Sequence, residues 1–126
     1  MDDLQLSGAA LAYVGDAYFE VLVRRRLLLS GLTRPKDLNR FARSYVKATA
    51  QSDAVERILP LLTAEETEIF KRGRNASGLS VPKSADALSY RRATGLEALF
   101  GWLYLGGKEA RAKELFEAAF EEEKLT

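Results

Sequence analysis

Apolar side chains recur along the chain at the spacing of an α-helix. Between Ser7 and Leu29 no proline interrupts this pattern, and Ser30 with Gly31 marks its end. Pro35 suits the first turn of a second helix, because its missing N–H would have no partner there. We therefore expect one long helix near the N-terminus and a second over 35–43.

The middle of the chain continues this pattern with clear start and stop signals. A third helix is expected over 44–59, with Pro60 ending it. Thr63 and Glu66 form a capping box, in which each side chain binds the backbone N–H of the other. The helix that they open should end near Gly73.

The last third contains the one long loop that we expect, over 73–84. Helix should resume over 85–105, stop at Gly106 and Gly107, and return over 108–123. No β-hairpin pattern is present. The fold class is therefore all-α, a bundle of about six to seven helices with short connections.

Composition narrows the chemistry that this bundle can perform. The 126 residues include no cysteine and no histidine, which excludes serine–histidine triads and most zinc sites. Carboxylates without imidazoles instead suit a hard cation such as Mg²⁺. No long apolar run predicts a membrane span, and the acidic start lacks a signal-peptide pattern, so we expect a cytoplasmic protein.

The net charge of +1 conceals a strong asymmetry along the chain. Residues 22–47 hold eight basic residues against one acidic residue, and residues 71–92 hold six against one. Segments 1–21 and 48–70 are acidic instead. This distribution is typical of a face that binds a polyanion, although solvated helix faces produce the same pattern.

Two acidic residues stand among apolar and small neighbours. Asp16 follows Gly15 in the first expected helix, and Glu97 lies between Gly95 and Gly101 in the helix expected over 85–105. A lone buried charge is costly, and glycine inside a helix usually serves close approach of a backbone or ligand. Each acid is either part of a site or the partner of an arginine.

Three motifs in order resemble a known family. Segment 11–20, LAYVGDAYFE, resembles the signature helix of the ribonuclease III family, and 94–105, TGLEALFGWLYL, resembles its second acidic helix. Segments 70–76, FKRGRNA, and 81–83, VPK, are similar to the pattern of the Mini-ribonuclease III subfamily, which lacks a separate double-stranded-RNA-binding domain. The resemblance implies that residues 1–126 form a single ribonuclease III-like nuclease domain.

The resemblance also implies a metal site with only two acidic protein ligands. Asp16 and Glu97 match two of the family's four acids and would be catalytic residues that hold Mg²⁺, with Mn²⁺ as a substitute. Ala12 and Thr94 occupy the positions of the other two acids, as they do in Mini-ribonuclease III. Glu20 is expected to pair with an arginine rather than bind the metal.

The function that follows from the resemblance is cleavage of double-stranded RNA, leaving 5′-phosphate and 3′-hydroxyl ends. The implied substrate is the precursor of the large-subunit (23S) ribosomal RNA in a bacterium or plastid. The family acts as a symmetric homodimer, for which we expect Tyr13, Tyr18 and Phe19 as interface anchors. No sequence feature indicates whether a ribosomal protein assists.

Contacts to RNA are expected mainly from the loop over 73–84 and its flanks. Arg72, Arg74, Asn75 and Lys83 would contact phosphates or 2′-hydroxyls. Arg24, Arg25 and Arg26 fan around their helix and cannot all face one duplex.

Two other readings remain at this point. One is an RNA-binding or ribosome-assembly module of the same fold without activity, suggested by Ala12 and Thr94. The other is a helical protein-interaction domain whose basic faces bind an acidic partner. Cleavage of a long RNA duplex in Mg²⁺ separates the first from an enzyme, and salt-dependent RNA binding separates the second.

Overall fold

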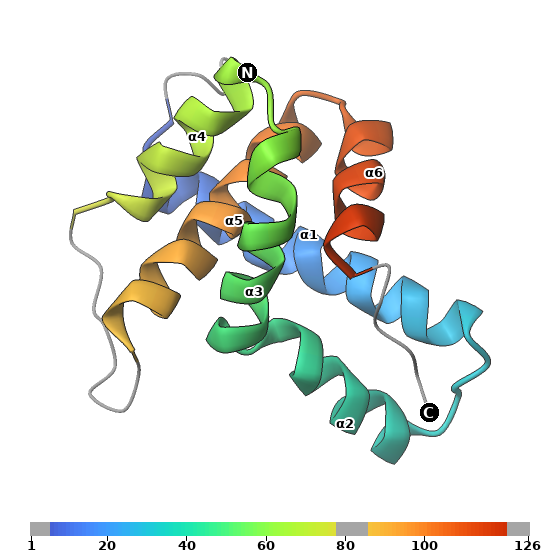
Figure 1. Ribbon diagram of the computed structural model, residues 1–126. Helices are drawn as coiled ribbons and strands as arrows, with labels where there is room; N and C mark the ends of the chain where they lie inside the picture. The colour runs from blue at the N-terminus through green and yellow to red at the C-terminus, as the bar shows by residue number, and fades with distance from the viewer. Residues whose placement is uncertain (1–5, 78–85, 121–126) are drawn as a thin grey trace.

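The computed structural model describes residues 6–77 and 86–120 and is α-helical, without a strand in those two ranges (Figure 1). The all-α prediction is therefore confirmed. Its elements, in chain order, are α1 Gly8–Leu29, α2 Pro35–Val46, α3 Ala48–Ile58, the 3₁₀ turn η2 Leu59–Leu61, α4 Ala64–Arg74, α5 Ala87–Leu105 and α6 Glu109–Phe120. Within the described ranges, no helix is long and apolar enough to cross a membrane.

Helices α1 and α5 cross at the centre of the bundle, with α3 and α4 packed against α5 (Figure 1). Two glycines permit the crossing. A Cβ atom on Gly15 would lie 1.6 Å from the carbonyl oxygen of Glu97, and one on Gly101 would lie 2.0 Å from that of Leu11. The two backbones therefore touch, and no side chain fits between them.

Aromatic rings hold the outer helices to this centre. Phe19 on α1 is fully buried, with ring centroids 5.5 Å from Phe100 on α5 and 5.6 Å from Phe116 on α6. Tyr45 on α2 meets Phe120 at 5.0 Å. Such pairs contribute about 0.5–1.5 kcal/mol each beyond the area that they bury.

The boundary between α2 and α3 differs from the prediction. It lies at Lys47, whose extended backbone (φ −65°, ψ 149°) separates the two helices, and not at Ser44. Ser44 remains helical, and its hydroxyl donates to the carbonyl of Phe41 at 2.7 Å. Pro60 follows α3 within the turn η2, so its expected role as a stop holds.

The predicted capping box at the start of α4 is present, and its Glu66 also forms an ion pair with α6. Thr63 Oγ1 accepts from the Glu66 N–H at 3.1 Å, and Glu66 Oε1 accepts from the Thr63 N–H at 2.9 Å. Arg111 on α6 donates to both oxygens of Glu66 at 2.8 Å. These bonds hold the pKa of buried Glu66 below its ordinary value, mainly through the Arg111 hydrogen bonds.

Candidate active site

Asp16 and Glu97 meet where α1 crosses α5. Gly15 touches the backbone of Glu97, so the next residue of α1, Asp16, lies beside the Glu97 side chain. The two carboxyl groups are close enough for Asp16 to raise the pKa of Glu97. The glycines that flank these acids thus serve close backbone approach, as the sequence indicated, and they bring the two predicted residues together.

The carboxyl of Glu97 is strongly affected by this position. Burial raises its pKa from 4.5 to about 8, and the charges of Asp16 and, more weakly, Glu20 add to the rise. Asp16 is exposed, so the expectation that its charge would be costly to bury is wrong for that residue. The cost of burying a charge falls on Glu97 of α5 instead, because its carboxyl lies further inside the helix crossing.

Gln51 on α3 completes the site and was not predicted from the sequence. Its side chain is 2% exposed, and its Nε2 donates to Glu97 Oε2 at 3.5 Å. This contact opposes the rise in the Glu97 pKa. The sequence does contain a signal for this residue. Gln51 lies four and seven positions before Val55 and Ile58, so it is a polar residue on the apolar, buried face of its helix.

The positions of the two missing acids offer no carboxylate to a metal. Ala12 is 7% exposed and Thr94 is 6% exposed, so both face the interior. The Thr94 hydroxyl donates to the carbonyl of Tyr90 at 3.0 Å and is used within its own helix. Neither position supplies a further oxygen ligand at the surface where Asp16 lies.

The predicted RNA-binding residues gather in part at one end of the bundle. Arg72 and Asn75 line a surface hollow of about 750 Å³ together with Lys71, Glu68 and the start of α1. Arg72 donates to the Leu6 carbonyl at 3.2 Å. Arg74 lies outside the hollow and donates to the Asn75 side chain at 3.1 Å. Lys83 lies outside the described residues.

A comparison with protein-family models matches the ribonuclease III domain over residues 9–108. The chain belongs to the ribonuclease III family. It is similar to the "Mini-ribonuclease 3" of Symbiobacterium thermophilum, 48% identical over 92% of this chain and 89% of the relative. The protein of that name in Enterococcus faecalis is 46% identical, over 90% and 88%. These relatives show membership of the Mini-ribonuclease III group and confirm an endoribonuclease.

A solved structure agrees with this family assignment. The crystal structure of a Fusobacterium nucleatum protein superposes with a TM-score of 0.82 at 33% identity, covering 95% of this chain and 96% of that one. The ribonuclease III fold expected from the motifs is therefore confirmed over nearly the whole chain.

The donor set of this ribonuclease III domain fits a hydrated Mg²⁺ ion. Within residues 6–77 and 86–120 no group of three or more acidic side chains is close enough to hold a metal. Asp16 and Glu97 nevertheless form an adjacent carboxyl pair whose repulsion a cation would relieve. Mg²⁺ commonly takes one or two carboxylates and completes its shell with water and phosphate oxygens.

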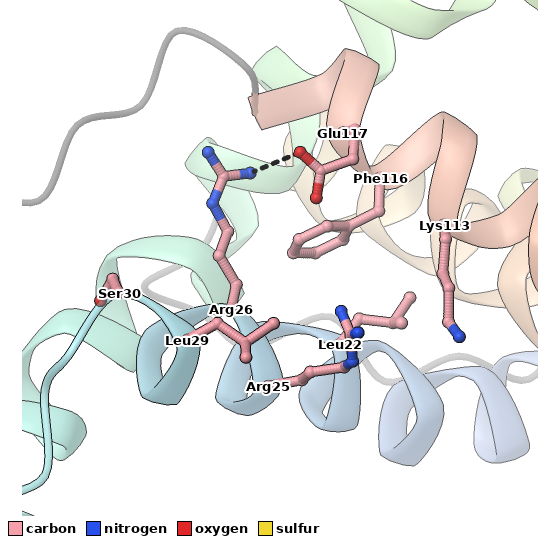
Figure 2. Close-up of a pocket in the computed structure, with 8 residues that line it drawn as sticks. All are labelled: Leu22, Arg25, Arg26, Leu29, Ser30, Lys113, Phe116 and Glu117. Carbon is pink, nitrogen blue, oxygen red and sulfur yellow. Dashed lines mark ion pairs between the residues drawn. The ribbon is translucent and has the colours of Figure 1, made fainter.

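Glu20, Arg24 and Arg26, the other charged residues of α1 with printed contacts, have partners outside the acidic pair. Glu20 lies 3.7 Å from Arg24, which confirms the arginine pairing expected for it. Arg26 reaches across to α6, where it donates to the Phe120 carbonyl at 2.6 Å and faces Glu117 (Figure 2). The hollow of about 270 Å³ beside it contains none of the predicted site residues.

The three residues expected at a dimer interface differ widely in how much of their side chains is exposed. Tyr13 is 84% exposed, whereas Tyr18 is 8% exposed and Phe19 is fully buried within the protomer. A side chain without accessible surface makes no direct contact with a second copy. Of the three, Tyr13 is therefore the one with exposed surface for a partner, while Tyr18 packs against Tyr104 with ring centroids 4.9 Å apart and the rings tilted by 37°.

Proposed function

We propose that this protein is a Mg²⁺-dependent endoribonuclease that cleaves double-stranded RNA and leaves 5′-phosphate and 3′-hydroxyl ends. Mn²⁺ is expected to substitute for Mg²⁺. The observation that carries the proposal is the meeting of Asp16 and Glu97 at the helix crossing of a ribonuclease III domain. An exposed and a buried carboxyl in contact suit a cation that must also face substrate.

Each residue of the site has a distinct task in this proposal. Asp16, on the exposed side, would hold the metal where the scissile phosphate can reach it. Glu97 is held from behind by Gln51 and supplies the second carboxylate, giving up its proton when the cation binds. Bound Mg²⁺ supplies positive charge to the phosphate and lowers the pKa of the attacking water. The water would form a bond to phosphorus and lose a proton to solvent, while the bond from phosphorus to the 3′ oxygen breaks and that oxygen takes up a proton.

RNA is held by charge at the end of the bundle near α4. Lys71, Arg72 and Asn75 line one hollow with the N-terminus of α1, where the helix dipole favours an anion. We assign phosphate contacts to Arg72 and Arg74, a 2′-hydroxyl contact to Asn75, and a further phosphate contact to Lys83. Such contacts recognise the shape of a duplex more than its sequence.

We further infer that the active form is a homodimer. Exposed apolar side chains at Tyr13, Val21 and Leu28 share one face of α1 with exposed Arg24, and Asp16, three positions after Tyr13, lies at the edge of that face. A two-fold contact along this face would place two sites near each other, one for each strand of a duplex.

The biological role that we propose is maturation of the 23S ribosomal RNA precursor in the bacterial cytoplasm. The relatives named above are bacterial proteins that share nearly the whole chain. No residue pattern in the site identifies the transcript or a helper protein, so this part rests on membership of the Mini-ribonuclease III group.

Substitution of Asp16 tests the catalytic proposal. Asp16→Asn should reduce cleavage of a long RNA duplex in Mg²⁺ by at least about a thousandfold, because the variant loses a charged metal ligand. RNA binding in EDTA should persist, because the predicted phosphate contacts lie elsewhere. Mg²⁺ should raise the melting temperature of the unsubstituted protein but not that of the variant.

Lys71→Gln serves as the matched control for charge at the opposite end of the bundle. It should weaken RNA binding while leaving the Mg²⁺ effect on melting temperature intact. An Asp16→Asn protein that still cuts, or an unsubstituted protein that binds the duplex without cutting it in Mg²⁺, would overturn the proposed activity.

A further inference from the structure

One side of α2 carries a continuous line of positive charge. Lys36, Arg40, Arg43 and Lys47 are separated by four, three and four positions, which places them on one helical face. All four are exposed. The line covers about 16 Å along the helix, from a rise of about 1.5 Å per residue. Arg34, the exposed N-cap residue, extends it at one end.

Little of this charge is neutralised within the protein. Arg40 lies 3.6 Å from Asp37 and 4.8 Å above the Phe41 ring. In the described part of the chain no acidic side chain pairs with Lys36, Arg43 or Lys47. Exposed like charges in a row repel one another, so the arrangement is unfavourable for the free protein and favours a polyanion.

The packing of α2 fixes the direction of the line. Leu38, Phe41 and Tyr45, on the other side of the helix, pack against the core. The charged face therefore points to solvent, along an edge of the molecule where α2 lies far from α4 (Figure 1).

The line ends one helical turn before Gln51, the residue that contacts Glu97. The backbone N–H of Gln51 donates to the Lys47 carbonyl at 3.1 Å, so Lys47 precedes Gln51 by one helical turn. Gln51 in turn contacts Glu97. A duplex bound at the site thus has a row of cations leading away from it over α2, on elements different from those that form the hollow near α4.

We propose that the solvent face of α2 binds the phosphate backbone of the RNA duplex beyond the cleavage point. This inference rests on the proposed function, because it takes double-stranded RNA as the ligand. The face is polar throughout, with Asn39 and Ser44 between the cations. Protein interfaces normally have an apolar centre that is depleted of lysine, so an acidic protein fits this face less well than RNA.

The test compares two variants that each lose three positive charges. The first is Lys36→Gln with Arg40→Gln and Arg43→Gln, all on the α2 face. The control is Arg25→Gln with Lys108→Gln and Lys113→Gln, three exposed residues on or next to α1 and α6. Both should keep the melting temperature of the unsubstituted protein within a few degrees, since all six side chains are exposed.

Binding to an RNA duplex of about 30 base pairs is then measured in EDTA at several salt concentrations. The α2 variant should bind about tenfold more weakly at low salt, and its slope of log affinity against log salt should fall by about three, one for each lost phosphate contact. The control should change either quantity far less. In Mg²⁺ the α2 variant should show a raised KM and an unchanged kcat.

Equal weakening in both variants would overturn the inference, because net charge alone would explain it. An α2 variant that binds RNA normally but loses binding to poly-glutamate would assign the face to an acidic protein, which also overturns it. The EDTA measurement does not depend on cleavage. A protein that binds RNA through α2 and never cuts would refute the proposed activity alone, whereas normal cutting with normal binding by the α2 variant would refute only this inference.

Discussion

At the scale of single residues, Glu97 combines two unfavourable surroundings. Its carboxyl is buried at the helix crossing, and it faces the carboxyl of Asp16. In the metal-free protein both conditions favour the protonated form, so the pKa lies at about 8 instead of 4.5. Residues placed in this way lower stability in return for function.

Replacement of Glu97 should therefore stabilise the metal-free protein at alkaline pH. The folded state holds a proton that the unfolded state has released between pH 4.5 and about 8, so its stability falls across that interval. Glu97→Gln removes this pH dependence. The difference in free energy of unfolding between the variant and the unsubstituted protein should therefore be about 2–4 kcal/mol more in favour of the variant at pH 8.5 than at pH 4. Urea unfolding in EDTA at both pH values measures it, with exposed Glu68→Gln as the control.

A Glu97→Gln protein whose stability falls with pH as steeply as before would show that another group takes up the proton. The same variant should lose cleavage, because the amide is a neutral ligand. A Glu97→Gln variant that is more stable but inactive would show that this carboxyl serves activity and not the stability of the fold.

At the scale of helices, the crossing of α1 and α5 depends on the absence of two side chains. Gly15→Ala would place its methyl group 1.6 Å from a backbone carbonyl oxygen, which cannot move aside as a side chain can. Overpacking in a core typically costs about 1–3 kcal/mol, and a backbone contact should cost at least the upper value. Thermal unfolding should show a clearly lower midpoint.

Gly106→Ala is the matched control for this substitution. Gly106 ends α5 with φ −83°, which alanine adopts readily, and it is exposed. An unchanged midpoint in Gly15→Ala, or an equal loss in both variants, would contradict the account of the crossing.

The sequence predicted these helices well where a local signal marks their ends. The capping box at Thr63 and the proline at position 35 both start helices where expected. The break at Lys47 was missed, because no proline or glycine marks it and tertiary packing of Tyr45 and Gln51 decides it. Gln51 was missed for a related reason, since its partner on α5 is distant in sequence.

At the scale of the whole molecule, functional groups divide between surfaces. The acidic pair lies at the centre, one basic region lies beside α4, and another lies on α2. The exposed face of α1 between Tyr13 and Leu28 presents three large apolar side chains, Tyr13, Val21 and Leu28, with Arg24 among them. A molecule with one site can cut one strand, so paired cuts in a duplex require two copies.

Disruption of the proposed dimer should convert paired cuts into single nicks. Val21 is 57% exposed at the middle of the α1 face, so Val21→Asp should spare the protomer fold while placing two like charges together at the two-fold contact. Light scattering at micromolar concentration should then report a monomer, and denaturing gels should show cuts in one strand at a time. Leu61→Asp, at a position 51% exposed on η2, should leave the dimer intact. A Val21→Asp protein that stays dimeric would exclude this face of α1 as the contact between copies.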